Sequence, residues 1–149
     1  MRILIAPALL VSTALLAAPV SAEIVGETHL YTIGDTTFEG YVATNTALDE
    51  PKGTVLIVHD WDGLTDYEMR RADMLAALGY TAFAIDVYST DVNPQGFEEY
   101  RAASGAMYAD RETFRERLLG AVDEAANIPG ASEDMVMIGY CFGGAAVLE

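Results

Sequence analysis

The sequence predicts an α/β domain with a mainly parallel sheet, helices on both faces of the sheet and an antiparallel hairpin on its N-terminal side. Short apolar runs of strand length alternate with longer stretches whose apolar residues keep helical spacing. The short runs are apolar at consecutive positions, as in strands buried on both faces. Two β-like segments joined by a turn precede the first of these runs.

The predicted hairpin consists of residues 29–33 and 37–44, because the turn-forming pair Gly34 and Asp35 separates these two segments. Residues 54–58 are apolar or β-branched throughout, which predicts the first buried strand. The chain is therefore expected to enter the parallel part of the sheet after the hairpin.

A helix is predicted next, with Asp66 as its cap and Gly79 as its end. Residues 80–85 then form a second buried strand, because they are again mostly apolar. This order of strand, helix and strand is typical of parallel pairing.

Two further helices and a third strand complete the expected pattern. Asn93 and Pro94 open one helical region, which extends to about residue 107, and Asp110 opens the next one. Residues 135–138 are apolar and of strand length.

The first 22 residues have the features of a secretory signal peptide. Arg2 supplies the positive start, residues 3–16 form the apolar run, and Val20 and Ala22 stand at the small-residue cleavage positions. We therefore expect residues 1–22 to be removed and the protein to be exported, either to the periplasm or out of the cell.

A membrane anchor is the competing interpretation of the same segment. Pro7 and Pro19 interrupt its apolar run, and no other apolar stretch approaches the roughly 20 residues that a membrane-spanning helix needs. A cleaved signal, with no membrane association afterwards, is the interpretation that we prefer.

The expected mature chain is strongly acidic. Loss of Arg2 leaves 7 basic and 23 acidic side chains, a formal net charge of −16. Nucleic acids and anionic membrane surfaces are therefore unsuitable partners, because little positive charge is present to neutralise phosphate. No calcium-loop motif is present, and we expect neither a metal nor a cofactor.

Cys141 is the only cysteine of the chain, so no disulfide can form within it. It lies in Gly139-Tyr140-Cys141-Phe142-Gly143, directly after the third apolar strand and before an expected helix start. This pattern of glycine, nucleophile and glycine at a strand-to-helix junction forms a tight turn that exposes the central side chain. A small buried cysteine at a strand end is the structural alternative.

A second polar segment, His59-Asp60-Trp61-Asp62-Gly63, comes after the first parallel strand. Because ligands bind outside the carboxyl ends of the strands in such sheets, we expect this loop and the cysteine turn to border one crevice. His59 is better interpreted as a brace of the loop than as a catalytic group. Trp61 either caps the core or forms a wall of the crevice.

Together these segments resemble the dienelactone hydrolase family of the α/β-hydrolase superfamily. The resemblance rests on the cysteine turn, on His59-Asp60 with Gly63 behind it, and on the strand that ends in Asp86-Val87-Tyr88. It covers approximately residues 37–149 and implies hydrolysis of a small-molecule carboxylic ester or lactone through a Cys-His-Asp triad.

The resemblance also implies roles for individual residues. Cys141 would be the nucleophile, the backbone N–H groups of Trp61 and Phe142 would form the oxyanion hole, and Gly139 and Gly143 would be the glycines of the turn. Asp60 stands where well-known members have a glutamate that contacts the resting thiol, and its side chain is one methylene shorter.

The acid and the histidine of such a triad come after the nucleophile in chain order, but only eight residues lie beyond Cys141. We therefore expect residues 23–149 to be the N-terminal part of a single domain, truncated after the nucleophile turn, with an open apolar edge and little activity by itself. The main alternative is a binding or structural module that keeps the fold without catalysis. A redox-active thiol ranks last, because no Cys-x-x-Cys pair is present.

Overall fold

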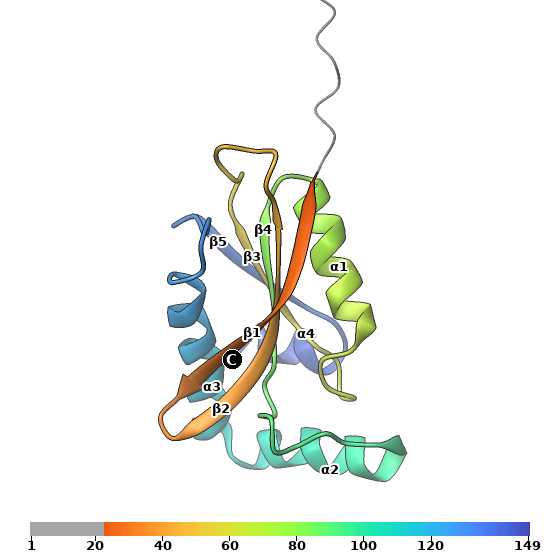
Figure 1. Cartoon of the computed structure of the whole chain (residues 1–149). Coiled ribbons are helices and arrows are strands. Elements are labelled where there is room, and N and C mark those ends of the chain that lie inside the picture. Colours follow the sequence, from red (N-terminus) through yellow and green to blue (C-terminus); the bar gives the residue numbers. More distant parts are fainter. Residues whose placement is uncertain (1–22) are drawn as a thin grey trace, which may run out of the picture.

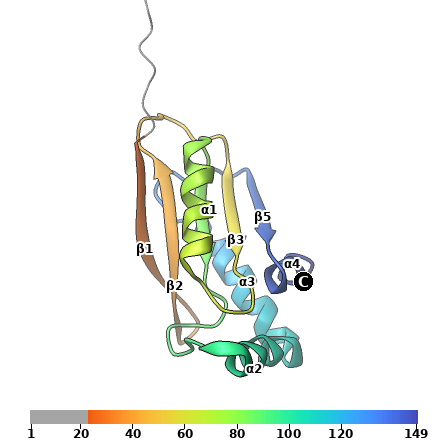
Figure 2. The same cartoon turned by 90° about the vertical axis from the view of Figure 1, so that its right-hand side faces the viewer.

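The structure is a computed structural model that describes residues 23–149, so the predicted signal peptide lies outside the described residues. Within this range the chain forms a central sheet with helices packed against it (Figures 1 and 2). None of the helices in residues 23–149 has the length and apolar character that crossing a membrane requires.

A mixed sheet of five strands has the order β1-β2-β4-β3-β5. The antiparallel hairpin is confirmed, and β2 also pairs antiparallel with β4, whereas β3 is parallel to both of its neighbours. Only β2 therefore runs against the other strands. The strands are β1 (Ile24–Ile33), β2 (Thr36–Asn45), β3 (Thr54–Val58), β4 (Thr81–Ile85) and β5 (Met135–Gly139).

Helices cover both faces of the sheet, which confirms the predicted fold class. Helix α1 (Asp66–Ala77) lies on one face, and α3 (Arg111–Ala125) lies on the other (Figure 1). Helix α2 (Gly96–Ala109) packs against α3, and the short α4 (Phe142–Ala146) comes directly after β5.

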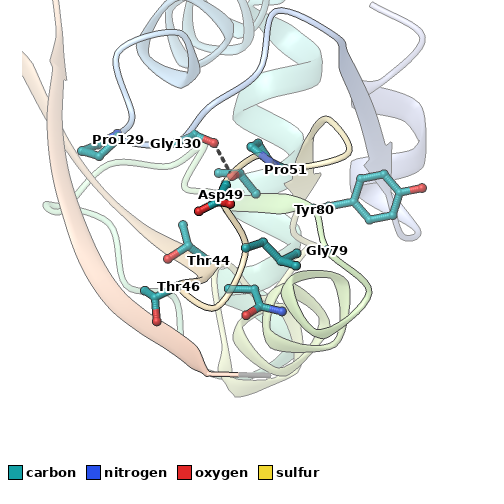
Figure 3. A pocket seen from close by; sticks show the side chains of 11 residues that line it. Thr44, Thr46, Asp49, Pro51, Gly79, Tyr80, Pro129 and Gly130 are labelled. Carbon is teal, nitrogen blue, oxygen red and sulfur yellow. Dashed lines mark hydrogen bonds between the residues drawn. The ribbon is translucent and has the colours of Figure 1, made fainter. Parts of the chain in front are cut away.

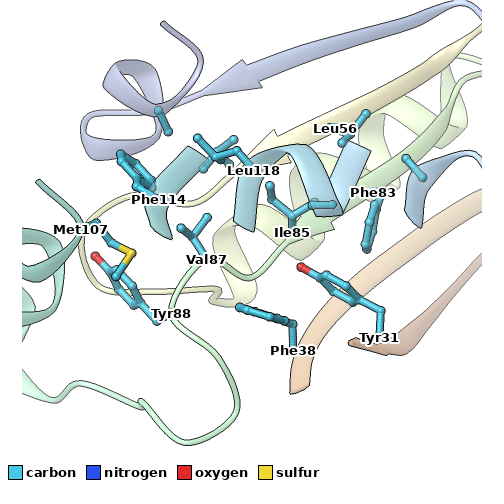
Figure 4. Packing of buried hydrophobic residues seen from close by; sticks show 14 of the residues in the cluster. Tyr31, Phe38, Leu56, Phe83, Ile85, Val87, Tyr88, Met107, Phe114 and Leu118 are labelled. Atoms are coloured by element: carbon cyan, nitrogen blue, oxygen red, sulfur yellow. The ribbon is translucent and has the colours of Figure 1, made fainter. Parts of the chain in front are cut away.

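The two faces of the sheet are built from side chains of different size. Ala72 and Ala76 of α1 are fully buried against Ala82 and Ala84 of β4, so small residues let this helix approach the sheet closely. The opposite face carries large side chains, and Phe83 lies there in the cluster between the sheet and α3 (Figure 4). Most of the apolar volume is therefore on the α3 side.

Two predicted helix starts are wrong by a few residues. Thr65, and not Asp66, caps α1, because Thr65 has an extended backbone and exchanges hydrogen bonds with the buried Glu68 in a capping box. Helix α2 begins at Gly96 rather than at Asn93. The cap of α3 is confirmed, since the Thr113 N–H donates to the Asp110 carboxylate at 3.1 Å.

Candidate active site

Cys141 occupies a strained turn between β5 and α4. Its φ of 50° and ψ of −108° lie where non-glycine residues are rare, and its side chain is exposed. The structural alternative of a buried cysteine is therefore wrong. The turn places the thiol at the carboxyl end of the parallel strands, where ligands bind in sheets of this kind.

The two glycines of the turn occupy positions that have no room for a side chain. A Cβ on Gly139 would collide with the backbone of Gly143, and a Cβ on Gly143 would collide with the carbonyl groups of Val58 and His59. The turn therefore packs directly against the end of β3, as the glycine spacing predicts.

The backbone around Cys141 leaves one amide available at the start of α4. The Gly143 N–H donates to the Tyr140 carbonyl at 2.7 Å, and the Gly144 N–H donates to the Cys141 carbonyl at 3.1 Å. The Phe142 N–H has no hydrogen-bond acceptor within residues 23–149. The Trp61 N–H, in the loop after β3, has none there either. Both amides therefore lack an acceptor among the described residues, as donors of an oxyanion hole would.

His59 is a buried brace between two loops. Its Nδ1–H donates to the Asp60 carbonyl, and its Nε2 accepts from the Val87 N–H at 3.1 Å. Burial lowers the pKa of this imidazole below its ordinary 6.5. Because both ring nitrogens are engaged and the side chain is inaccessible, His59 cannot serve as a proton acceptor for Cys141, which agrees with the predicted role.

Asp86 fixes the loop after β4 on the other side of His59. Its carboxylate accepts the backbone N–H groups of Tyr88 at 2.8 Å and Ser89 at 2.9 Å. Burial raises the pKa of Asp86. Ser89 adopts a φ of 91°, so this loop, like the cysteine turn, contains a non-glycine residue with positive φ.

Trp61 caps the core, which is one of the two roles considered for it. Its ring packs against the hydrophobic core and also lies 5.3 Å from Phe97 and 5.7 Å from Tyr100, centroid to centroid. Its carbonyl accepts the Tyr88 hydroxyl at 3.0 Å. The side chain therefore caps the core and joins it to α2, while the backbone is held at the end of β3.

Asp60 makes no hydrogen bond to Cys141. Its Oδ1 is buried and has no hydrogen-bond partner among the described residues. Burial and the nearby charge of Asp60 raise the pKa of Asp62, two residues along the loop. The loop thus holds two acidic side chains close together. One oxygen of Asp60 remains free to accept a hydrogen bond.

Two arginines, one on α1 and one on α3, make specific contacts. The Arg71 guanidinium lies 5.3 Å from the centroid of the Tyr67 ring and 5.4 Å from that of Tyr140, beside Cys141. Arg117 donates to the carbonyl groups of Val87 and Tyr88 at 2.7 and 2.8 Å. Sequence reasoning missed both, and only the spacing of four residues between Tyr67 and Arg71 gave a local signal.

Two cavities lie at opposite ends of the sheet. One of about 280 Å³ is bordered by Thr44, Asp49, Pro51 and Tyr80 at the amino ends of the parallel strands, far from Cys141 (Figure 3). Another of about 260 Å³ is lined by Asp62, Gly63, Asp86 and Tyr88, beside the loop after β3. The second cavity lies at the carboxyl ends of the strands, where ligands bind in such sheets. Cys141 is not among its lining residues, so this cavity is not the predicted crevice between the loop and the cysteine turn. Within residues 23–149 no three metal-ligating side chains are placed to hold an ion.

Comparison with solved structures finds two similar proteins with a TM-score of 0.79. One, named m3DLH, is 28% identical, and the match covers 84% of this chain and 52% of that one. The other is a dienelactone hydrolase-like promiscuous phosphotriesterase from metagenomic libraries, 29% identical, with 86% and 53% of the two chains covered. A putative dienelactone hydrolase from Klebsiella pneumoniae, 19% identical with a TM-score of 0.67 and coverage of 82% and 52%, shares the fold.

The chain spans about half the length of these solved proteins. No curated protein matches the sequence. The sequence model of the dienelactone hydrolase family matches residues 38–149, which include β3, the His59 loop, Cys141 and α4. The match extends over most of the chain and confirms the resemblance that the motifs predicted. The chain belongs to the dienelactone hydrolase family.

Proposed function

We propose that this chain is the nucleophile-bearing part of a hydrolase that acts on carboxylic esters or lactones through a Cys-His-Asp triad. The observation that carries the proposal is the exposed, positive-φ position of Cys141 between β5 and α4. Membership of the family supports hydrolase chemistry on a small molecule.

In this mechanism the Cys141 thiolate attacks the carbonyl carbon of the ester. The tetrahedral oxyanion accepts hydrogen bonds from the Trp61 and Phe142 N–H groups, and the alcohol leaves with a proton from the triad histidine. Water, deprotonated by the same histidine, then attacks the thioester and releases the acid and the thiol. The Cys141 side chain and the two amides supply everything in these steps except the base. The mechanism requires no metal or cofactor.

Neither histidine within residues 23–149 is placed to act as the base for Cys141. His59 is buried with both nitrogens engaged, and His29 is 2.7 Å from Glu124, where it joins β1 to α3. We propose that the triad aspartate and histidine lie further along the same reading frame, and that residues 1–149 alone have little activity. The length of the similar proteins supports this proposal.

Export is a separate proposal, which rests on residues 1–22. We expect a mature N-terminus at Glu23 and accumulation outside the cytoplasm. Cell fractionation and then N-terminal sequencing test both points, and an intact Met1 on cytoplasmic protein would contradict them.

The function is tested by expressing the complete reading frame and its Cys141→Ala variant and assaying 4-nitrophenyl acetate. Loss of the nucleophile is expected to lower kcat by several orders of magnitude. Equal activity of the two proteins would refute the assignment. A parallel assay with an activated phosphotriester is worthwhile, because one similar protein is a promiscuous phosphotriesterase.

A non-catalytic module is the second candidate, because both described histidines are engaged elsewhere. The two candidates differ in the residues that they require after Glu149. An aspartate and then a histidine at the ends of two later strands would favour the enzyme, and their absence would favour the module.

A further inference from the structure

Tyr88 lies between the two segments that carry the proposed oxyanion amides. It ends the Asp86-Val87-Tyr88 segment after β4, and only 2% of its surface is exposed. The proposed reaction steps do not use its side chain, but a buried tyrosine hydroxyl needs a hydrogen-bond partner. The hydroxyl donates to the Trp61 carbonyl at 3.0 Å. Tyr88 therefore connects the end of β4 to the loop after β3.

The backbone of Tyr88 is held on both sides. Its N–H donates to the Asp86 carboxylate at 2.8 Å, and its carbonyl accepts from the Arg117 guanidinium of α3 at 2.8 Å. The bond from Arg117 is charge-assisted and therefore stronger than one between neutral groups. Burial raises the pKa of Tyr88 above its ordinary 10, so the hydroxyl keeps its proton and remains a donor. Tyr88 is thus a fixed point from which its hydroxyl can orient the loop.

Two successive peptide units of this loop are held from the side of β4. The Trp61 N–H and the Asp60 carbonyl belong to one planar unit, and the His59 ring donates to that carbonyl. His59 is itself held by the Val87 N–H at 3.1 Å. The next unit contains the Trp61 carbonyl, which accepts from Tyr88. Because the two units share the Trp61 Cα, the direction of the Trp61 N–H depends on both hydrogen bonds.

The ring of Tyr88 reaches the residue that carries the second proposed amide. Its centroid lies 5.6 Å from that of Phe142, the first residue of α4, and 4.7 Å from that of His59. The His59 and Phe142 rings are 5.9 Å apart and nearly parallel, at 19°. The three rings therefore form one packed group, at separations where aromatic pairs attract one another. Tyr88 thus contacts both the brace of the Trp61 loop and the start of α4.

We propose that Tyr88 is a positioning residue of the oxyanion hole, which sets the direction of the Trp61 N–H through its hydroxyl and the place of Phe142 through its ring. This inference rests on the proposed function, because it concerns the two amides assigned there to the tetrahedral oxyanion. Such amides act only at hydrogen-bonding distance, and a misplacement of about 1 Å can lower the rate about 100-fold. Loss of the Tyr88 hydroxyl is therefore expected to lower turnover and to leave the Cys141 thiol unaffected.

A purely structural role in the core is the alternative, because Tyr88 also belongs to the large cluster on the α3 side (Figure 4). Tyr108 provides a matched control. Its ring lies 5.5 Å from the same Phe142 ring, but it is 43% exposed and makes no hydrogen bond to residues 59–63. Tyr88→Phe and Tyr108→Phe each remove one hydroxyl and keep the ring, so both variants are expected to fold. A residue that only fills the core would affect stability and not the kcat of the folded protein.

Turnover of 4-nitrophenyl acetate by the protein from the complete reading frame gives the first measurement. We expect Tyr88→Phe to lower kcat at least about 10-fold with KM within about twofold, and Tyr108→Phe to keep both near their wild-type values. Alkylation of Cys141 by iodoacetamide, followed by mass spectrometry, should keep its wild-type rate in both variants, because displacement of iodide by the thiolate forms no oxyanion. Equal kcat in the two variants would overturn the proposal. So would a loss of alkylation in Tyr88→Phe as large as its loss of kcat.

Hydrogen exchange gives a second measurement, which needs no activity. The amides of residues 61–63 are expected to exchange at least about 10-fold faster in Tyr88→Phe than in the wild-type protein, and at the wild-type rate in Tyr108→Phe. Unchanged exchange in Tyr88→Phe would show that the hydroxyl does not hold the loop, and would overturn the proposal. Failure of the proposed function is recognisable separately, because it appears as an active Cys141→Ala variant and not as a change in these exchange rates.

Discussion

Gly143, at the start of α4, packs against the carbonyl of His59 so closely that no Cβ fits between them. This contact joins the two segments that the proposed chemistry requires, the cysteine turn and the loop that carries Trp61. The position of the proposed nucleophile relative to the proposed oxyanion amides therefore depends on a glycine.

Replacement of Gly143 by alanine is expected to destabilise the protein by about 2 to 3 kcal/mol, because the new methyl group must displace two backbone carbonyls. Gly105→Ala in α2 is the matched control. No atom lies within 4 Å of a Cβ added at Gly105, so this variant is expected to raise the free energy of unfolding by about 0.5 to 1 kcal/mol. Urea unfolding measures both, and similar free energies for the two variants would contradict the packing.

Ser89→Gly is expected to stabilise the protein by about 1 kcal/mol, because Ser89 has a φ of 91° that glycine adopts without strain. The backbone N–H that donates to Asp86 is retained in this variant. Ser104→Gly, within α2, is expected instead to lower the free energy of unfolding by about 1 kcal/mol. Thermal unfolding would refute the account of strain if both changes lowered the midpoint.

His59 predicts a pH dependence of stability. Its pKa in the folded protein is below the ordinary 6.5, so the unfolded chain binds the proton more readily. The free energy of unfolding should therefore fall as pH drops below about 6.5, and should level off below the folded pKa. His59→Gln is less stable at pH 8 but should lack this fall. Urea titrations from pH 8 to 5 test it, and an equal slope in both proteins would show that another group is responsible.

Residues 23–149 alone are expected to unfold without a cooperative and reversible transition. The β5 edge and exposed apolar side chains such as Val136 would be open to water and prone to association. Circular dichroism during heating and cooling measures this directly. A sharp, fully reversible melt would show that this part of the domain is stable by itself.

Local chemistry explains why several elements are predictable from the sequence. The apolar runs of β3 and β5, the cap at Asp110 and the glycines around Cys141 each depend on neighbours within a few residues. The predicted cap of α1 is one residue late. Thr65 and Asp66 are both preferred cap residues, so the local sequence does not distinguish between them. The reciprocal hydrogen bonds with Glu68 favour Thr65.

Contacts between distant segments are not predictable in the same way. The insertion of β4 between β2 and β3 depends on the whole sheet. Arg117 reaches the Val87 carbonyl from a helix 30 residues away, and the Arg71 guanidinium lies over the Tyr140 ring across the α1–β5 interface. In the sequence both arginines resemble the solvated residues beside them on their helices. The spacing of one helix cannot show which of its residues meets another element.

The most direct test of the nucleophile assignment is mass spectrometry of the complete protein quenched during turnover of 4-nitrophenyl acetate. The assignment predicts an acetyl group on the peptide that contains Cys141, formed at a rate no slower than kcat, and its absence in Cys141→Ala. Turnover without an adduct on Cys141, with kcat/KM unchanged in the alanine variant, would contradict it.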